Sequence, residues 1–309
     1  MASSSIRVWL SGPDSLELMG GLPDGMTADV WTGGEYLPDP ADEVEVVVLP
    51  SGLPDSRLQV LAKLPRLRLI QLLSAGAEQV IPFVPPGVTL CNARGAHDPA
   101  VAEWIMAVVL AQVRLLPRFI AAQAAWTWDY AVREPLAGQR LLILGYGSIG
   151  EAVERRLAPF DVTVERIARR ARPGVLSMDD LPAALPKADI VVLLVPVTPA
   201  TTGLVDARFL SQMHDQALLV NAARGSIVDT DALLAELRSG RLRAALDVTD
   251  PEPLPAGHPL WSAPGLLLTP HVGGATTQAV PRAMAIVRDQ LARYAAGEPL
   301  LNVVGSQGY

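Results

Sequence analysis

The sequence predicts an α/β fold in which two parallel sheets are each covered by helices, the second sheet being doubly wound. Short apolar runs rich in β-branched residues recur along the chain, and segments of crossover length separate them. Glycine and proline stand between most of these elements. With 309 residues, 50% of them hydrophobic, the chain is long enough for two domains with separate cores.

The first α/β unit is predicted between Ile6 and about Cys91. Its strand candidates are "SIRVWL", "ADVWT", "VEVVVL", "LRLIQLL" and "GVTLCN". A single helix is expected next, from about Asp98 to Ala125, with apolar residues on nearly every face. Such a helix is typical of a segment packed on both sides, either between domains or in a dimer. Its most apolar part, "WIMAVVLAQV", is too short to span a bilayer.

The second unit is predicted from Gln139 onward. Its strand candidates are "RLLILGYGSIG", "VTVERIA", "ADIVVLLVP", "ALLVNAARG", "RAALDV" and "GLLLTPH", and six strands in this order indicate a doubly wound sheet. The last segment has helical periodicity that we expect Pro281 to interrupt early and Gly297 to end. We expect this terminal helix to pack back on the first unit.

Composition narrows the functional classes. The net charge of -7 is spread along the chain, which argues against nucleic acid as the main partner. Cys91 is the single cysteine and the first residues lack the pattern of a signal peptide, so we expect a cytoplasmic protein and no membrane partner. The four histidines and one cysteine show no metal-ligand spacing, so no metal site is expected.

A glycine-rich turn is the first candidate site. Gly145, Gly147 and Gly150 follow an apolar strand and precede a helical segment. In this setting glycine permits the tight turn, lets the backbone approach a pyrophosphate and allows close helix–strand packing, while the helix N-terminus favours the anion. The turn therefore predicts a dinucleotide site.

The arginines after the next strand predict which dinucleotide binds. An acid that takes the ribose hydroxyls normally stands near Ala168, but Arg169, Arg170 and Arg172 follow instead. Guanidinium groups bind a 2′-phosphate through paired hydrogen bonds, whereas an acid would repel it. We therefore expect NADP(H) to be preferred over NAD(H). The alternative is that these arginines form a solvated loop.

Three further residues follow later strand candidates: Arg224, Glu252 and His271. Ligands of open α/β sheets bind near the carboxyl ends of strands, so these side chains are expected to converge. Reduction of a 2-oxo acid needs a cation for the carboxylate and a proton donor for the developing alkoxide. Arginine suits the first task and histidine the second, and a neighbouring glutamate stabilises and orients a protonated histidine. The hypothesis is that Arg224 anchors the substrate, His271 exchanges the proton and Glu252 supports His271.

These residues stand in five ordered motifs: "GYGSIG", "VPVTPATTGLVD", "NAARGSIVDTDALLAEL", "ALDVTDPEP" and "TPHVGG". Together they resemble the D-isomer-specific 2-hydroxyacid dehydrogenases, over nearly the whole chain. The resemblance implies a flavodoxin-like substrate-binding domain made of residues 1–93 and 279–309. It implies a Rossmann-type dinucleotide-binding domain at residues 94–278, and a homodimer joined through that domain.

The resemblance also carries roles onto single positions. The catalytic arginine, glutamate and histidine of the family match Arg224, Glu252 and His271. The loop whose amides hold the substrate carboxylate resembles "LSAGAEQ", which gives Ser74, Ala75 and Gly76 as substrate-binding candidates. Asp247 matches the aspartate near the nicotinamide carboxamide. Other cofactor-lining positions match Ser148, Ile149, Val195, Pro196, Ala222, Ala223 and Gly273.

Departures from the family's pattern refine the expectation. Most NAD-dependent members have an aspartate near Ala168, so the chain resembles the NADPH-preferring reductases. The length of 309 residues disfavours phosphoglycerate dehydrogenases with an extra regulatory domain. The loop "LSAGAEQ" holds no lysine like that of phosphite dehydrogenase, and Glu252 stands where formate dehydrogenases have glutamine.

The sequence thus predicts a cytoplasmic NADPH-dependent reductase that converts small 2-oxo acids, of the glyoxylate or hydroxypyruvate type, to (R)-2-hydroxy acids. NAD(H) use stays open. One alternative is a dinucleotide-sensing scaffold like the corepressors that share this fold. Another is a dehydrogenase of the same fold that acts on an aromatic or phosphorus-containing acid.

Overall fold

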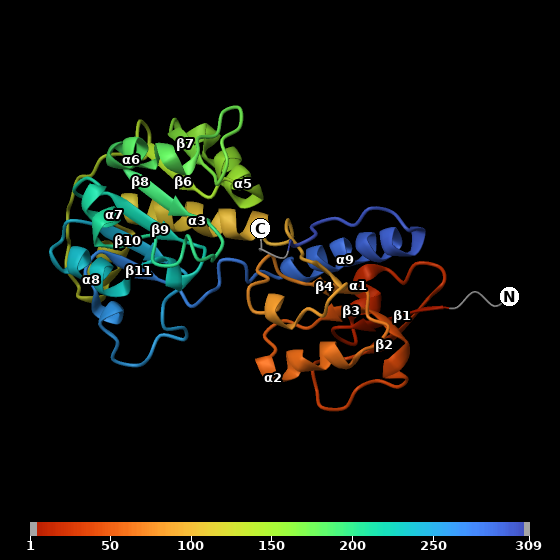
Figure 1. The fold of residues 1–309 in the computed structure, drawn as a ribbon. Coiled ribbons are helices and arrows are strands. Elements are labelled where there is room, and N and C mark those ends of the chain that lie inside the picture. Colours follow the sequence, from red (N-terminus) through yellow and green to blue (C-terminus); the bar gives the residue numbers. More distant parts are fainter. Residues whose placement is uncertain (1–4, 306–309) are drawn as a thin grey trace. The chain divides into compact units, whose positions relative to one another are not determined.

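Two compact units make up the chain in the computed structural model, which describes residues 5–305 (Figure 1). One unit holds the residues up to His97 and those from Thr276 onward, and the other holds Asp98–Ala275. The sequence placed these boundaries after residue 93 and before residue 279. Both units contain a parallel sheet with helices, so the predicted α/β fold class is confirmed.

The first unit has a five-stranded parallel sheet in the order β2-β1-β3-β4-β5, which is the flavodoxin-like order. Its strands are β1 (Ile6–Leu10), β2 (Met26–Val30), β3 (Val44–Leu49), β4 (Leu69–Leu72) and β5 (Thr89–Cys91). Its helices are α1 (Ser15–Met19), α2 (Asp55–Leu58) and α9 (Ala279–Ala296). Apart from the edge strand β2, the strands are mostly buried, which explains their continuous apolar runs.

Helix α9 returns from the C-terminal part of the chain to the first sheet (Figure 1). Met284 and Val287 pack against Val8 of β1 in one buried cluster. The interruption expected at Pro281 does not occur, because Pro281 lies in the first turn, where its missing N–H leaves no helical bond unmade. Gly297, with φ 67°, ends the helix as predicted.

The second unit has a six-stranded parallel sheet in the order β11-β10-β9-β8-β6-β7. Its strands are β6 (Arg140–Leu144), β7 (Thr163–Ile167), β8 (Ile190–Leu193), β9 (Leu218–Asn221), β10 (Arg243–Leu246) and β11 (Leu266–Leu268). Helices α5 (Ser148–Leu157), α6 (Leu181–Ala184), α7 (Ala207–Gln212) and α8 (Thr230–Arg238) connect them. The strand order reverses beside β6, which forms the topological switch point where ligands of such sheets bind.

The single helix expected from Asp98 to Ala125 is wrong: two helices, α3 (Asp98–Val113) and α4 (Leu116–Ala124), meet at a 66° bend. Pro117, at the second position of α4, has no N–H to bond to the carbonyl four residues earlier in α3, and Leu115 takes a left-handed φ of 57° at the break. Helix α3 packs mainly against α5 and also touches β9 and β10, within one buried apolar cluster. Within residues 5–305 no single helix is long and apolar enough to cross a membrane, although the bent pair reaches that length together.

Candidate active site

The glycine turn connects β6 to α5 at the switch point. Gly145 has φ 105°, and a Cβ there would lie 2.5 Å from the backbone of Leu194 and of Val195. A Cβ on Gly150 would lie 3.1 Å from the ring of Tyr146. Glycine at these two positions is therefore required by the backbone conformation and by close packing onto β8 and the turn itself.

Gly147 serves a different purpose, because a Cβ there would meet no protein atom within 4 Å. The space above the turn is thus open, and the first residues of α5, Ser148 and Ile149, begin beside it. An open space at the first turn of a ten-residue helix fits the pyrophosphate of a dinucleotide. Val195, Pro196, Ala222 and Ala223 follow the carboxyl ends of β8 and β9, on the same edge of the sheet.

Tyr146 lies inside the turn and contacts three charged residues, Glu154, Arg166 and Arg172. From the sequence we did not identify it as a site residue. Its hydroxyl donates to Glu154 Oε2 at 2.5 Å, and Glu154 also accepts hydrogen bonds from Arg166 of β7. Arg172 donates to the Tyr146 carbonyl at 2.7 Å, and its guanidinium carbon lies 5.5 Å from the ring centroid. Arg166 lies 5.8 Å from the same centroid. The tyrosine therefore holds Arg172 on the turn by a hydrogen bond and a cation–π contact.

Arg169 and Arg170 are exposed just after β7, on a segment that folds back on itself. Backbone hydrogen bonds between Arg172 and Val175 close this segment, and Ala168 donates to Leu176. The structure thus brings one of the three arginines onto the glycine turn and leaves two at the exposed end of the strand.

His271 and Glu252 form a hydrogen-bonded pair, with 2.6 Å between His271 Nδ1 and Glu252 Oε1. His271 follows β11 and Glu252 follows β10, which are neighbouring strands. The second carboxylate oxygen of Glu252 accepts a longer bond of 3.4 Å from the Thr249 amide. His271 has a left-handed φ of 54°, which a non-glycine residue adopts only when its surroundings hold it there.

Asp247 holds the backbone around His271. Its buried carboxylate accepts hydrogen bonds from the amides of Val272 (2.8 Å) and Gly273 (2.7 Å). Its carbonyl accepts one from the His271 amide at 2.7 Å. Thr269 Oγ1 donates to the same carboxylate at 2.6 Å. From the sequence we expected Asp247 to lie near the cofactor. The structure shows that Asp247 also holds the loop of His271, a role that no sequence pattern indicated.

Gly273 also contributes to that loop, because a Cβ there would lie 2.8 Å from Asp247 Oδ2. Trp104 Nε1 of α3 donates to Thr269 Oγ1 at 3.1 Å, which extends the network to the helix. The loop that carries His271 is therefore held by hydrogen bonds that involve the Asp247 carboxylate, the Thr269 hydroxyl and the Trp104 indole.

Arg224 follows β9, at the same carboxyl edge as His271 and Glu252. The side chain of the buried Asn221 fixes the backbone at this position. It donates a hydrogen bond to the Arg224 carbonyl at 2.9 Å and accepts one from the Ala223 amide at 3.0 Å. A Cβ on Gly225 would overlap the Thr249 carbonyl, so this loop packs tightly against the one that leads to Glu252. The three expected catalytic residues thus come from three neighbouring strands.

Ser74, Ala75 and Gly76 lie in the other unit, after the carboxyl end of β4. Ser74 Oγ donates to the Gly76 carbonyl at 3.0 Å, and Asn92 Nδ2 donates to the Ala75 carbonyl at 2.8 Å. The segment is ordered by its own polar contacts, and its substrate role stays a prediction. No cluster of three or more metal-ligating side chains forms within residues 5–305.

Comparisons with known proteins agree with this geometry. The model of the family described as "D-isomer specific 2-hydroxyacid dehydrogenase, NAD binding domain" matches residues 106–273, more than half of the chain. A D-3-phosphoglycerate dehydrogenase from Methanocaldococcus jannaschii is 31% identical over 283 residues, 87% of this chain and 53% of that protein. The chain therefore spans about half the length of that relative.

A glyoxylate reductase from Thermofilum pendens is 33% identical over 255 residues, covering 78% of this chain and 75% of that protein. A solved D-isomer specific 2-hydroxyacid dehydrogenase from Xanthobacter autotrophicus Py2, in complex with NADPH and MES, superposes with a TM-score of 0.85. It is 30% identical and covers 98% of both chains. A glycine turn for a nicotinamide dinucleotide, a histidine–glutamate pair and these matches lead to one assignment: the chain belongs to the D-isomer specific 2-hydroxyacid dehydrogenase family of oxidoreductases.

Proposed function

We propose that the protein is an NADPH-dependent reductase of small 2-oxo acids and that its products are (R)-2-hydroxy acids. The observation that carries the proposal is the 2.6 Å contact between His271 and Glu252. These residues follow β11 and β10, and β10 lies next to β9, which leads to Arg224. Glyoxylate and hydroxypyruvate are the proposed substrates, since the glyoxylate reductase from Thermofilum pendens is among the relatives.

In the proposed reaction His271 donates the proton. Glu252 occupies Nδ1, which fixes the imidazole ring and leaves Nε2 for the substrate oxygen. Arg224 holds the substrate carboxylate through its planar guanidinium. When bound at the glycine turn, the reduced nicotinamide supplies the hydride for the carbonyl carbon. The proton from His271 neutralises the oxygen as the alcohol forms, and His271 regains a proton from solvent.

The proposed preference for NADPH depends on the arginines after β7. No carboxylate follows the strand between Ile167 and Gly174, whereas Arg169, Arg170 and Arg172 do. Arg172 already lies on the glycine turn, through Tyr146. Three cations around the expected ribose position favour a 2′-phosphate, and the similar Xanthobacter protein binds NADPH.

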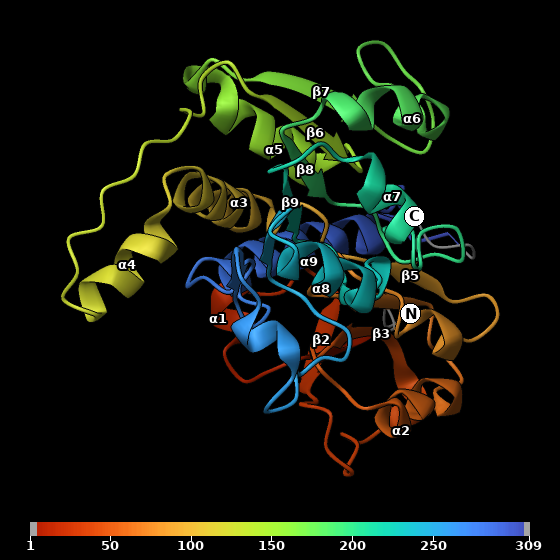
Figure 2. The same cartoon turned by 90° about the vertical axis from the view of Figure 1, so that its left-hand side faces the viewer.

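We also propose a homodimer formed through α4 and the segment that follows it. Trp126 and Trp128 are 98% and 97% exposed, and Tyr130 is 81% exposed. In Figure 2 helix α4 and this yellow segment extend away from the strands of their unit. Aromatic side chains exposed to this degree in one short segment are typical of an interface.

The direct test is the oxidation of NADPH and NADH, side by side, with glyoxylate, hydroxypyruvate, pyruvate and phenylpyruvate. Steady turnover with NADPH and one small acid would support the proposal. Equal rates with NADH would contradict the cofactor preference, and binding of NADPH without turnover of any acid would favour the dinucleotide-sensing scaffold. Turnover of phenylpyruvate alone would favour a dehydrogenase of larger acids.

A further inference from the structure

A cavity of about 360 Å³ lies at the amino ends of the strands in the second unit. The starts of four neighbouring strands, β10, β9, β8 and β6, contribute to its wall, on the edge of the sheet opposite the glycine turn and His271. The charged and polar side chains of its lining that matter here are Arg133, Glu134, Asp189, His214, Gln216 and Arg243. None of these residues takes part in the proposed reaction.

Arg243 lines the cavity, and its guanidinium donates hydrogen bonds to backbone carbonyls, which carry no charge. Nε and Nη2 donate to the Gln216 carbonyl at 3.1 and 2.9 Å, and Nη1 donates to the Gln112 carbonyl at 3.0 Å. Within residues 5–305 no carboxylate oxygen lies within 4.0 Å of this guanidinium. A guanidinium has five N–H donors, so two remain for another acceptor.

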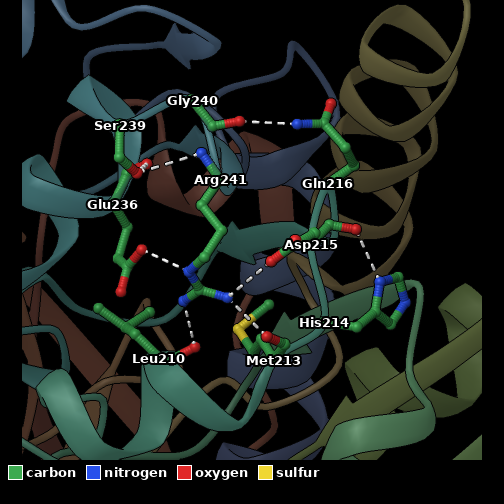
Figure 3. A network of polar contacts seen from close by, with 9 residues as sticks. All are labelled: Leu210, Met213, His214, Asp215, Gln216, Glu236, Ser239, Gly240 and Arg241. Atoms are coloured by element: carbon green, nitrogen blue, oxygen red, sulfur yellow. Dashed lines mark hydrogen bonds and ion pairs between the residues drawn. The ribbon is translucent and has the colours of Figure 1, made fainter.

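Arg241, two residues before Arg243, differs from it because carboxylates lie beside its guanidinium (Figure 3). Its Nε donates to Glu236 at 2.6 Å, Asp215 lies 3.8 Å away, and the carbonyls of Leu210 and Met213 take its other donors. Arg241 is thus paired with two carboxylates, whereas the hydrogen-bond partners of Arg243 described above are carbonyl groups alone.

A second guanidinium faces the same cavity. Arg133 Nη2 donates to Gln216 Oε1 at 3.3 Å, so Gln216 bonds one arginine through its side chain and the other through its carbonyl. Gln216 has φ 67°, at a turn position that favours glycine or asparagine. Burial and the adjacent charge of Arg133 lower the pKa of Arg243 to about 10. Two like charges are therefore held side by side at some cost in stability.

Within residues 5–305 neither acid of the lining forms an ion pair with Arg133 or Arg243. Asp189 is engaged by His214 Nε2 at 3.2 Å and by the Arg140 amide at 2.7 Å. Glu134 is exposed and, within residues 5–305, lies beyond 4.0 Å of either guanidinium. His214 Nδ1 shares a hydrogen bond of 2.9 Å with the Asp215 carbonyl (Figure 3).

From this geometry we infer a second ligand site, at which Arg133 and Arg243 bind the phosphate group of a small anion in the cavity. Each guanidinium keeps N–H donors for phosphate oxygens beyond the hydrogen bonds described above, and an anion would offset the repulsion between the two charges. The site lies on the opposite sheet edge from the proposed dinucleotide site, so both ligands could be bound at once.

The test is isothermal titration calorimetry with inorganic phosphate at constant ionic strength, on four proteins. These are the wild type, Arg133→Gln, the matched exposed control Arg238→Gln, and Arg169→Gln/Arg170→Gln, which removes the other candidate phosphate contacts. Arg133 is exposed in a loop, so its replacement leaves the fold intact, which circular dichroism checks. We expect saturable binding that weakens about tenfold in Arg133→Gln alone.

Unchanged affinity in Arg133→Gln would overturn the inference, as would non-saturable heats in the wild type. Loss of binding in the Arg169→Gln/Arg170→Gln protein would assign the phosphate to the dinucleotide region and would equally overturn it. A change in oligomeric state in Arg133→Gln, with phosphate affinity unaltered, would show that the cavity belongs to a subunit contact. Density that bridges both guanidiniums in a phosphate-soaked crystal would support the inference independently.

Discussion

His271 Nδ1 lies 2.6 Å from Glu252 Oε1, although the two residues are 19 positions apart in the sequence. The pair forms because β10 and β11 are adjacent and parallel, so the loops after them emerge at one edge of the sheet. A carboxylate on Nδ1 stabilises the imidazolium and directs Nε2 outward. The pair therefore has the form of a proton donor with its positioning partner.

Replacing His271 with Ala is expected to lower kcat/KM with the preferred acid by about 10²–10⁴-fold, because the developing alkoxide loses its proton donor. Glu252→Gln keeps a hydrogen bond but loses the charge, and we expect a smaller loss, with an altered pH profile of kcat/KM. NADPH affinity, followed by fluorescence, should stay within about twofold in both. His258→Gln is the control, and near wild-type turnover in His271→Ala would contradict the assignment.

Asp247→Asn is expected to destabilise the loop that carries His271. The carboxylate accepts three hydrogen bonds, and an amide nitrogen in its place would face one of these donors, which costs about 1–3 kcal/mol. Urea unfolding should show the loss in stability, and kcat should fall with it because His271 is no longer held at φ 54°. Unchanged stability together with unchanged kcat would show that the loop does not depend on this carboxylate.

Arg169→Gln/Arg170→Gln should separate the two cofactors. The lost contacts with the 2′-phosphate are expected to cost about 1.5–3 kcal/mol together, so kcat/KM for NADPH should fall roughly 10- to 100-fold. The value for NADH, which lacks that phosphate, should change little. Arg155→Gln, an exposed arginine of α5, is the matched control. Parallel losses for both cofactors would mean that the arginines support the fold rather than the phosphate.

Trp126→Ser/Trp128→Ser is expected to convert the proposed dimer to a monomer. The wild type should sediment at twice the chain mass of 32.8 kDa, and the variant at that mass. The reason is that two nearly fully exposed indoles supply a large apolar area that a partner would bury. Tyr36→Ser, which removes a 94% exposed aromatic residue from the other unit, is the control. A monomeric wild type would contradict the proposal.

The fold could be predicted because its signals are local. Strands that are buried on both faces appear in the sequence as short apolar runs. Position 145 requires glycine because its φ is 105° and a Cβ there would lie 2.5 Å from backbone atoms. The break between α3 and α4 was signalled by Pro117, but the apolar pattern on either side concealed it. The approach of Arg224, Glu252 and His271 to one sheet edge followed from strand topology.

The contacts that sequence reasoning missed join residues with no periodic relation. Tyr146, Glu154 and Arg166 meet because β6 and β7 are neighbours and α5 returns across them. The Asp247 network depends on the path of one irregular loop, and the cavity between Arg133 and Arg243 on a turn at Gln216. Such contacts are set by backbone geometry, which composition and spacing do not encode.

The Tyr146–Glu154–Arg166 cluster gives the last prediction, a pH dependence. Hydrogen bonds from Arg166 hold the pKa of Glu154 below its ordinary value of 4.5. Because the folded pKa is depressed, the stabilising contribution is complete above the unfolded pKa and is lost as the pH falls through the folded one. Glu154→Gln should therefore be less stable than the wild type at neutral pH, by roughly 1–2 kcal/mol for a pair about a quarter exposed. In urea unfolding, the difference in stability between Glu154→Gln and the wild type should shrink steadily as the pH falls below the unfolded pKa. The control is Glu151→Gln, at an exposed position of the same helix, whose stability should equal that of the wild type. A difference that stays constant down to acid pH would mean that Glu154 acts through packing, because a contribution from its charge must disappear when the carboxylate is protonated.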